Sequence, residues 1–194
     1  MAGSADVWVA DVSPGVPGSL LAVEPGRPVE LVGGAGLGLT RVGLGLLAAA
    51  LTRRPLVAVD LNPVACDFAR RNAADEGLGD LVEVREGALD QVLADDERFA
   101  VVIADPPWVR RTETGRFPED PLLAIDGGDD GLEVAWGCVA VASRHLLPGG
   151  AAVLQLGTRA QADTIGAGLA DLGSLTLGEV RECERGVLVR LDQP

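Results

Sequence analysis

The residues best suited to chemistry are Asp105, Pro106, Pro107 and Trp108, which follow the apolar run 99–104. A run of this length fits a buried strand, and proline cannot donate the hydrogen bond that would continue a ladder. The strand therefore ends at a point where a carboxylate and an indole are exposed. The carboxylate and the backbone carbonyls accept N–H groups, and the indole can stack on a flat partner. The spacing predicts a catalytic site for a planar group that carries N–H bonds.

A second group of candidates surrounds a glycine-rich turn that contains Gly34 and Gly36 and follows Glu30. Glycines let a ligand approach the backbone, and the N–H groups of a following helix point outward. The next apolar run, 56–60, ends in Asp60, and an acid at a strand end can accept hydrogen bonds from both hydroxyls of a ribose. These residues predict a nucleotide-type cofactor site. The structural alternative for Asp60 is a cap of the helix that follows.

The elements that must position these sites alternate between apolar strands and longer periodic segments from Val29 onward. Strands separated by helices need crossover connections, which produce a mostly parallel sheet. We therefore expect an α/β fold with a single Rossmann-like, doubly wound, seven-stranded, mostly parallel sheet and an antiparallel C-terminal edge hairpin. The predicted strands are 28–32, 56–60, 81–85, 99–104, 151–156, 175–182 and 186–191, and the predicted helices are 36–52, 63–76, 88–95, 131–146 and 159–171.

The chain length of 194 residues is enough for one α/β domain and too short for two ordinary ones. Residues 1–27 are rich in Pro-Gly turns and are predicted to form an N-terminal flap or extension. Residues 28–194 are predicted to form the catalytic domain.

The formal net charge is −13, with 29 acidic against 16 basic residues. This charge repels a phosphate backbone, so extended nucleic-acid binding is disfavoured. A local exception is the cluster of Arg110, Arg111 and Arg116 just after Trp108. The cluster predicts either a solvated loop or a patch that meets the approaching substrate, and the sequence favours neither.

Location and metal content are predicted from what the sequence lacks. It has no apolar stretch of about 18 residues and no basic start of a secretory signal, which predicts a cytoplasmic protein without membrane association. Its three cysteines, Cys66, Cys138 and Cys183, are far apart and have no ligand spacing, which predicts thiols and no metal site. The oligomeric state is not determined by the sequence.

The chain resembles the class I S-adenosylmethionine-dependent methyltransferases, on the order of its glycine turn, Asp60 and the Asp105–Trp108 motif. The last of these is similar to the (Asn/Asp/Ser)-Pro-Pro-(Tyr/Phe/Trp) motif of enzymes that methylate planar nitrogens. The stretch from Gly127 to Leu132, the run Leu146–Gly150 and Gln161 resemble the HemK/PrmC-like group, which methylates a protein glutamine amide.

This resemblance implies S-adenosyl-L-methionine as the cofactor and N-methylation of an amide or exocyclic amine in a protein, nucleotide or small-molecule acceptor. It implies that Asp105, Pro106, Pro107 and Trp108 hold the acceptor. The cofactor would contact Glu30, Gly34, Gly36, Asp60, Leu61 and Ala88.

Three departures from the family pattern qualify the expected activity. Val32 stands where the first glycine of the cofactor loop is usual, and Ala88 stands where an acid commonly meets the adenine amino group. Asp105 replaces an Asn, and because an acid accepts more strongly than an amide, it slightly favours exocyclic amines as acceptors. The alternatives are a ribosomal RNA guanine methyltransferase and a catalytically degenerate partner subunit. A nicotinamide dehydrogenase is also compatible with the glycine turn and acid, but it leaves the Asp105–Trp108 motif unexplained.

Overall fold

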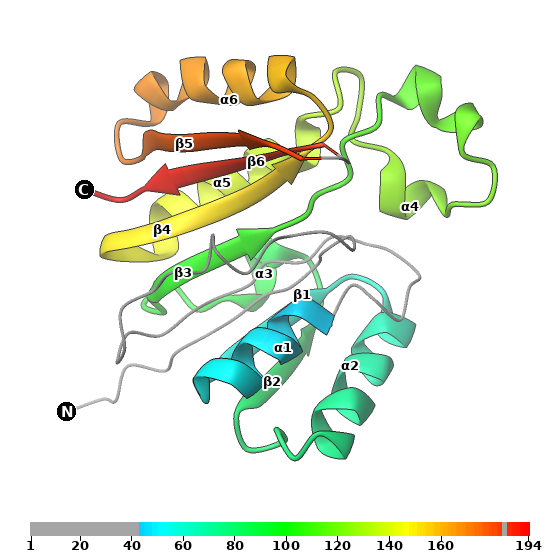
Figure 1. Ribbon diagram of the computed structural model, residues 1–194, viewed down its shortest axis with the longest axis vertical. Coiled ribbons are helices and arrows are strands. Elements are labelled where there is room, and N and C mark those ends of the chain that lie inside the picture. The colour runs from blue at the N-terminus through cyan, green and yellow to red at the C-terminus, as the bar shows by residue number, and fades with distance from the viewer. Residues whose placement is uncertain (1–42, 184–185) are drawn as a thin grey trace.

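The two strands that end at candidate site residues form where the apolar runs predicted them. The computed structural model describes residues 43–183 and 186–194 (Figure 1). The predicted strand 28–32, the segment 1–27 and the three cofactor-loop residues Glu30, Gly34 and Gly36 lie outside the described residues.

Strand β1 (Leu56–Asp60) is buried over its whole length and pairs in parallel with β2 (Val82–Glu86). Its register places Leu56 opposite Val82 and Asp60 opposite Glu86. The two strands thus end at the same edge, and Asp60 lies beside the turn that follows β2.

Strand β3 (Phe99–Ala104) is also fully buried and pairs in parallel with β4 (Leu146–Leu156). The sheet continues through β6 (Val187–Asp192) to β5 (Thr176–Glu182), both in antiparallel pairing. The predicted C-terminal hairpin is therefore confirmed, with β5 at the edge.

The single seven-stranded sheet was expected, but the described residues contain six strands in two sheets, β1-β2 and β3-β4-β6-β5. The division arises because β1 and β3 share no backbone ladder within the described ranges. The parallel pairs and the α/β layering agree with the prediction, and the count of seven stays a prediction.

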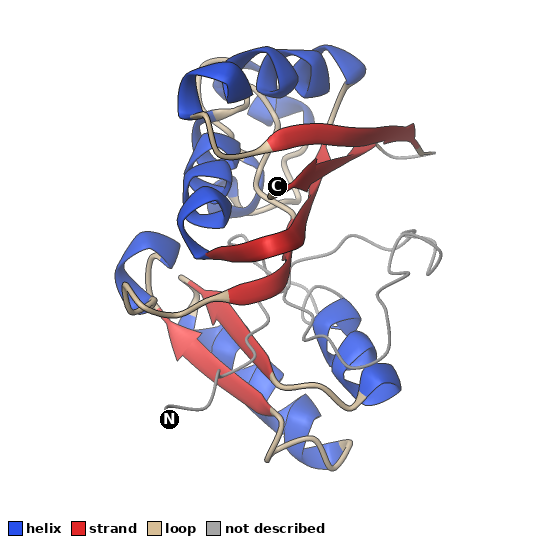
Figure 2. Cartoon of the chain, turned by 90° about the vertical axis from the view of Figure 1, so that its left-hand side faces the viewer, coloured by secondary structure: helices blue, strands red, loops and turns tan. Residues whose placement is uncertain are grey.

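Helices cover the strands from both sides, as the side view shows (Figure 2). Along β3 the side chains alternate between two apolar clusters. Val102 and Ala104 pack with residues of α5 and α6, whereas Val101 and Ile103 pack with residues of α1 and α2. This alternation follows from the two-residue period of a strand and makes the sheet doubly wound. The helix bounds are α1 Gly43–Thr52, α2 Pro63–Asp75, α3 Leu89–Val92, α5 Glu133–His145 and α6 Arg159–Leu172.

The predicted helix 88–95 is wrong in length, since α3 has only one turn. The Glu97 carboxylate accepts the Ala94 N–H, and the Arg85 guanidinium donates to the Val92 carbonyl. These side chains take backbone groups that a longer helix would pair internally. The turn stays short and leaves its residues beside the ends of β1 and β2.

The strand after α5 begins earlier than predicted. The helix ends at His145, and β4 starts at Leu146 rather than at 151. The run Pro148–Gly150 lies within β4 at an irregularity of register, where Gly149 and Gly150 exchange backbone hydrogen bonds with Gln193. Two short helices between β3 and α5 were not predicted: the 3₁₀ helix η2 (Arg111–Arg116) and α4 (Leu122–Ile125).

Within residues 43–183 and 186–194, no helix combines the length and apolar character needed to cross a membrane.

Candidate active site and cofactor cavity

A cavity of about 650 Å³ opens at the carboxyl ends of β1, β2 and β3. Its walls include Asp60 at the end of β1, Leu61 directly after it, Ala88 after β2 and Pro107 after β3. Four predicted site residues from three strands thus face one space. Its volume lies in the range that suits a cofactor-sized molecule.

Asp60 is 9% exposed, and its carboxylate accepts the backbone N–H of Asn62 at 2.7 Å. The helix cap is a different residue, since the Asn62 side chain accepts the Val64 N–H at 2.9 Å and Pro63 occupies the first helical turn. Asp60 therefore does not cap α2 itself. It braces the capping residue while its side chain borders the cavity.

The turn after β2 supplies a second acidic side chain that the sequence reasoning did not single out. Ala88 lines the cavity without an acceptor, and Asp90, in α3, lines it as well. Leu89 lies between them on the same wall. The signal was present in the sequence as an acid two positions beyond Ala88.

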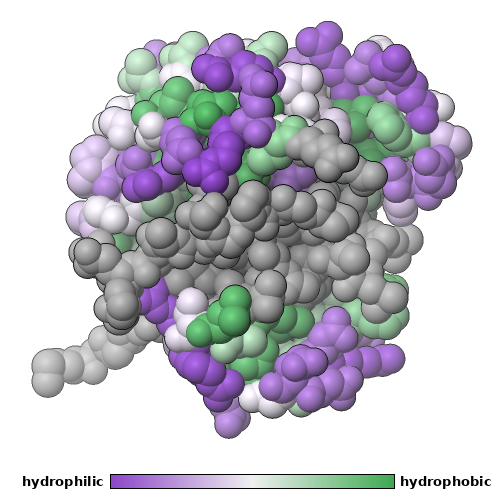
Figure 3. All heavy atoms as spheres, in the orientation of Figure 1, coloured by the Kyte–Doolittle hydropathy of each residue, from purple (hydrophilic) through white to green (hydrophobic). Residues whose placement is uncertain are grey.

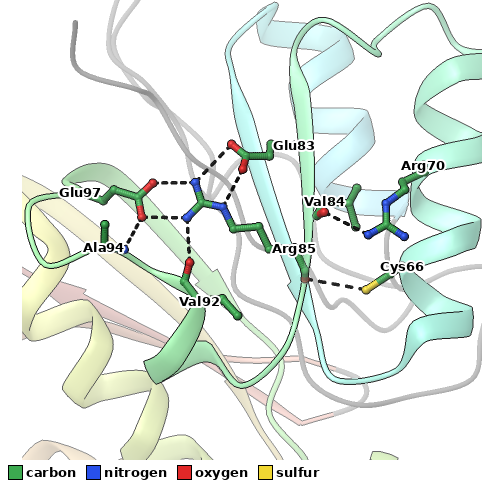
Figure 4. A network of polar contacts seen from close by, with 8 residues as sticks. All are labelled: Cys66, Arg70, Glu83, Val84, Arg85, Val92, Ala94 and Glu97. Carbon is green, nitrogen blue, oxygen red and sulfur yellow. Dashed lines mark hydrogen bonds and ion pairs between the residues drawn. The ribbon is translucent and has the colours of Figure 1, made fainter. Parts of the chain in front are cut away.

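A polar network holds α3 in this place (Figure 4). Arg85, on β2, makes two charge-assisted hydrogen bonds to Glu97 of 2.7 and 2.8 Å and a third hydrogen bond to the Val92 carbonyl at 3.0 Å. The bond to Glu97 raises the pKa of Arg85, and the same bond is the main cause that lowers the pKa of Glu97. Because Val92 ends α3, this ion pair fixes the cavity wall that carries Leu89 and Asp90.

The Asp105–Trp108 segment leaves β3 as a buried turn. Asp105 is 7% exposed, both prolines are buried, and the Trp108 side chain is half-buried. Pro107 faces the cavity, while the Trp108 side chain packs with Val109, Ala124 and Ile125. The structure therefore places the motif next to the cavity through Pro107. Asp105, Pro106 and Trp108 are not among the described residues that form its walls.

The glycine-rich stretch 127–132 wraps the backbone of this segment. A Cβ at Gly127 would lie 2.6 Å from the Pro107 carbonyl oxygen, and one at Gly131 would overlap the Trp108 carbonyl. Gly131 also has a φ of 78°, which favours glycine. Backbone bonds from Val109 N–H to the Ile125 carbonyl and from Gly127 N–H to the Val109 carbonyl complete the contact. These glycines are needed because two backbones meet without side chains between them.

The arginine cluster after Trp108 is engaged mainly with the protein itself. Arg111 forms ion pairs with Asp126 at 3.1 Å, Asp129 at 3.2 Å and Glu133 at 3.2 Å. The hydrogen bond to Asp126 is the main cause that raises the pKa of Arg111, and Arg116 pairs with Glu113 at 3.3 Å. These pairs favour a structural role in the loop for two of the three arginines.

Apolar side chains form the rim between α4 and α5. Leu122 is 64% exposed, Leu123 is 57% exposed and Val134 is 40% exposed, and all three border the cavity. In the space-filling view the hydrophilic surface near η2 and α4 includes a smaller hydrophobic area (Figure 3). The sequence gives no periodic signal for these leucines, because a short helix has too few residues to show one.

Comparisons with known proteins support a methyltransferase. Residues 42–120 match the family described as RMKL-like, methyltransferase domain. A release factor glutamine methyltransferase of Deinococcus radiodurans is 39% identical over 79% of this chain and 55% of its own length. A ribosomal protein uL3 glutamine methyltransferase of Bordetella pertussis is 30% identical over 70% of this chain and 46% of its own length.

Among solved structures, an RNA methyltransferase from Salinibacter ruber in complex with S-adenosyl-L-homocysteine matches with a TM-score of 0.55. The identity is 18%, over 91% of this chain and 87% of that chain. At this identity the match shows the shared fold alone. The chain spans about half the length of the curated relatives, 55% and 46% of the two described above.

Proposed function

We propose that this chain, which carries a class I S-adenosylmethionine-dependent methyltransferase domain, methylates the side-chain amide nitrogen of a glutamine in a protein. The observation that carries the proposal is the shared cavity, where Asp60 and Ala88 meet Pro107 of the Asp-Pro-Pro-Trp motif. The similarity to two kinds of glutamine methyltransferase favours an amide over the exocyclic amine that Asp105 slightly suggested. We assign residues 28–194 to this domain and residues 1–27 to an N-terminal extension.

The described residues fit S-adenosylmethionine at the adenosyl end. The Asp60 carboxylate suits the ribose hydroxyls, and Leu61, Leu89 and Pro107 offer apolar surface for the adenine ring. We assign Glu30, Gly34 and Gly36 to the remainder of the cofactor by resemblance.

We assign the adenine amino group to Asp90. Ala88, at the position where the family commonly has an acid, has no side-chain acceptor, whereas Asp90 borders the same cavity two residues further on, in α3. The acid is displaced by two residues instead of being lost. This assignment favours a cofactor-binding enzyme over a degenerate partner subunit.

The protein's part in the reaction is alignment of the acceptor. When bound, S-adenosylmethionine supplies an electrophilic methyl group. The Asp105 carboxylate and the Pro106 carbonyl would accept the two N–H bonds of the glutamine amide, which returns electron density to its nitrogen. Trp108 would hold the flat amide by stacking, and the buried prolines would keep this geometry rigid and exclude water.

The proposed partners are proteins of the translation apparatus, as the names of the relatives indicate. A cytoplasmic location belongs to this proposal because translation takes place there. The net charge of −13 continues to disfavour the ribosomal RNA alternative.

The proposal is tested by incubating the protein with methyl-labelled S-adenosylmethionine and, separately, a bacterial release factor, ribosomal protein uL3 and undermethylated ribosomal RNA. We expect label on a glutamine of one of the two proteins, located by peptide mass spectrometry. Label confined to RNA would refute the protein acceptor. Failure to bind S-adenosylhomocysteine in calorimetry would favour the partner-subunit alternative.

Asp105→Ala is the matched variant for the acceptor side. Because Asp105 is assigned to the acceptor, we expect turnover to be abolished while S-adenosylhomocysteine binds with unchanged affinity. A variant that loses cofactor affinity and keeps turnover would reverse the assignment.

A further inference from the structure

Gln161 is a buried polar side chain at the start of α6, with 7% exposure. Its Oε1 accepts the backbone N–H groups of Gly157 at 3.0 Å and Thr158 at 3.1 Å. Its Nε2 donates to the carbonyls of Trp108 at 2.9 Å, Gly131 at 3.3 Å and Asp130 at 3.4 Å. Two donors at one end and three acceptors at the other define which way the amide points.

Only half of this side chain is used by the helix. The capping box of α6 consists of the Thr158 hydroxyl, which accepts the Gln161 N–H, and Gln161 Oε1, which accepts the Thr158 N–H. Helix capping therefore requires the oxygen and not the nitrogen. The nitrogen serves the carbonyls of two other segments, the glycine stretch 127–132 and the Asp105–Trp108 turn.

The same corner also supports the indole of Trp108. A Cβ at Gly157 would overlap the six-membered part of the ring, so the ring lies directly against this backbone. The carbonyl of Trp108 and its ring are thus both held by residues 157–161. Gly131 leaves the room for this contact, because a Cβ there would overlap the Trp108 carbonyl and approach Gln161 Nε2.

We infer that Gln161 is a positioning residue of the acceptor site, which sets the orientation of the Trp108 backbone and ring from the first turn of α6. The inference rests on the proposed function, in which Trp108 stacks on the acceptor amide. It adds the turn between β4 and α6 to the parts of the molecule that determine methyl transfer.

Gln161→Glu separates the two halves of the side chain. The introduced carboxylate still accepts from Gly157 and Thr158, but it places a second acceptor against the Trp108, Asp130 and Gly131 carbonyls. An ionised carboxyl has no proton to donate to the Trp108 carbonyl, so the bond that holds the Trp108 backbone is lost. Thr158→Ala is the matched control, because it removes the other bond of the capping box and leaves the nitrogen of Gln161 in place.

We expect Gln161→Glu to lower kcat/KM for the protein acceptor by about tenfold to hundredfold at mildly alkaline pH. The affinity for S-adenosylhomocysteine should stay unchanged. Thr158→Ala should not show this loss. An equal loss in the Thr158 variant would reduce Gln161 to a helix cap.

Fluorine NMR of protein labelled with 5-fluorotryptophan provides a readout that needs no acceptor. The Trp108 resonance, assigned with Trp108→Phe, should shift in Gln161→Glu while the Trp136 resonance stays in place. If Gln161→Glu does not fold, Gln161→Leu, which removes the donor to the Trp108 carbonyl without adding a charge, is measured in the same way. An unmoved Trp108 resonance refutes the inference. A shifted resonance supports it even if no protein acceptor is found, and in that case the missing acceptor refutes only the proposed function.

Discussion

At the scale of single residues, Asp60 combines a structural bond with a place in the cavity wall. Its carboxylate braces the Asn62 N–H, and Asn62 in turn caps α2. The two roles are separable because the cap and the cavity use different side chains.

We predict that Asp60→Ala weakens S-adenosylhomocysteine binding by about tenfold to hundredfold, since a charged acceptor for the ribose is removed. Isothermal calorimetry measures the change. The control is Asn62→Ala, which should cost about 1 kcal/mol of unfolding free energy through loss of the cap and leave the affinity unchanged. Equal losses of affinity in both variants would mean that Asp60 only supports the helix start.

Asp90 is tested by ligand chemistry. The inosine analogue of S-adenosylhomocysteine lacks the exocyclic amine, so wild-type protein should bind it about tenfold more weakly than the adenosine form. Asp90→Ala should remove most of this preference, and Ala88→Asp in the same variant should restore part of it.

The control for charge is Asp96→Ala, which removes an exposed acid from the same stretch. It should leave the preference intact. Undiminished discrimination in Asp90→Ala would contradict the adenine assignment.

At the scale of elements, the corner between β4 and α6 joins the catalytic turn to a helix start. The capping box supplies hydrogen-bond acceptors for N–H groups at the start of α6. At its other end, Gly173 caps the helix with a φ of 68°. The helix is therefore well defined at both ends, which makes it a rigid support for the Gln161 side chain.

We predict that Thr158→Ala lowers the unfolding free energy by about 1 kcal/mol, the usual effect of losing a threonine cap. Urea unfolding followed by circular dichroism measures it. Thr164→Ala is the comparison, since its hydroxyl bonds to the Ala160 carbonyl inside the same helix. We expect the Thr164 variant to be close to wild type, and a larger loss there than at Thr158 would contradict the role of the cap.

At the scale of the whole molecule, the Arg85–Glu97 pair connects the two described sheets. Arg85 lies on β2, and Glu97 lies two residues before β3 begins. The backbone carbonyl of Glu97 is also 3.0 Å from Nδ1 of His145, at the end of α5. One ion pair thus links β2, α3 and the entry to β3. The Glu97 backbone also contacts the end of α5.

This pair predicts a pH dependence of stability. Arg85 holds the folded-state pKa of Glu97 below its ordinary value of 4.5, so its stabilisation is complete above that value and is lost as the pH falls through the lower, folded-state pKa. At about pH 7, Glu97→Gln should lower the unfolding free energy by about 1.5–3 kcal/mol.

The difference in unfolding free energy between wild type and Glu97→Gln should shrink as the pH falls through the folded-state pKa of Glu97. Denaturant titrations at several pH values measure it. A difference that is constant with pH would show that Glu97 acts through packing and not through its charge.

The sequence alone determined the features that depend on neighbouring residues. The apolar run 99–104 specifies a buried strand, the prolines end it at Asp105, and Asn62 with Pro63 starts α2, because each signal acts within a few residues. The same local motifs carry the resemblance to class I methyltransferases, and the similarity to glutamine methyltransferases and to a methyltransferase family over residues 42–120 agrees with it.

Only the tertiary structure decided what depends on residues far apart in the chain. Arg85 and Glu97 hold the end of the short helix α3, whose Asp90 borders the cavity in which Ala88 has no acceptor. Gln161 reaches the Trp108 carbonyl across more than fifty intervening positions, a bond that has no local signature. The physical reason is that side-chain hydrogen bonds are formed by packing, and packing brings together groups whose separation along the sequence carries no information about their distance in space.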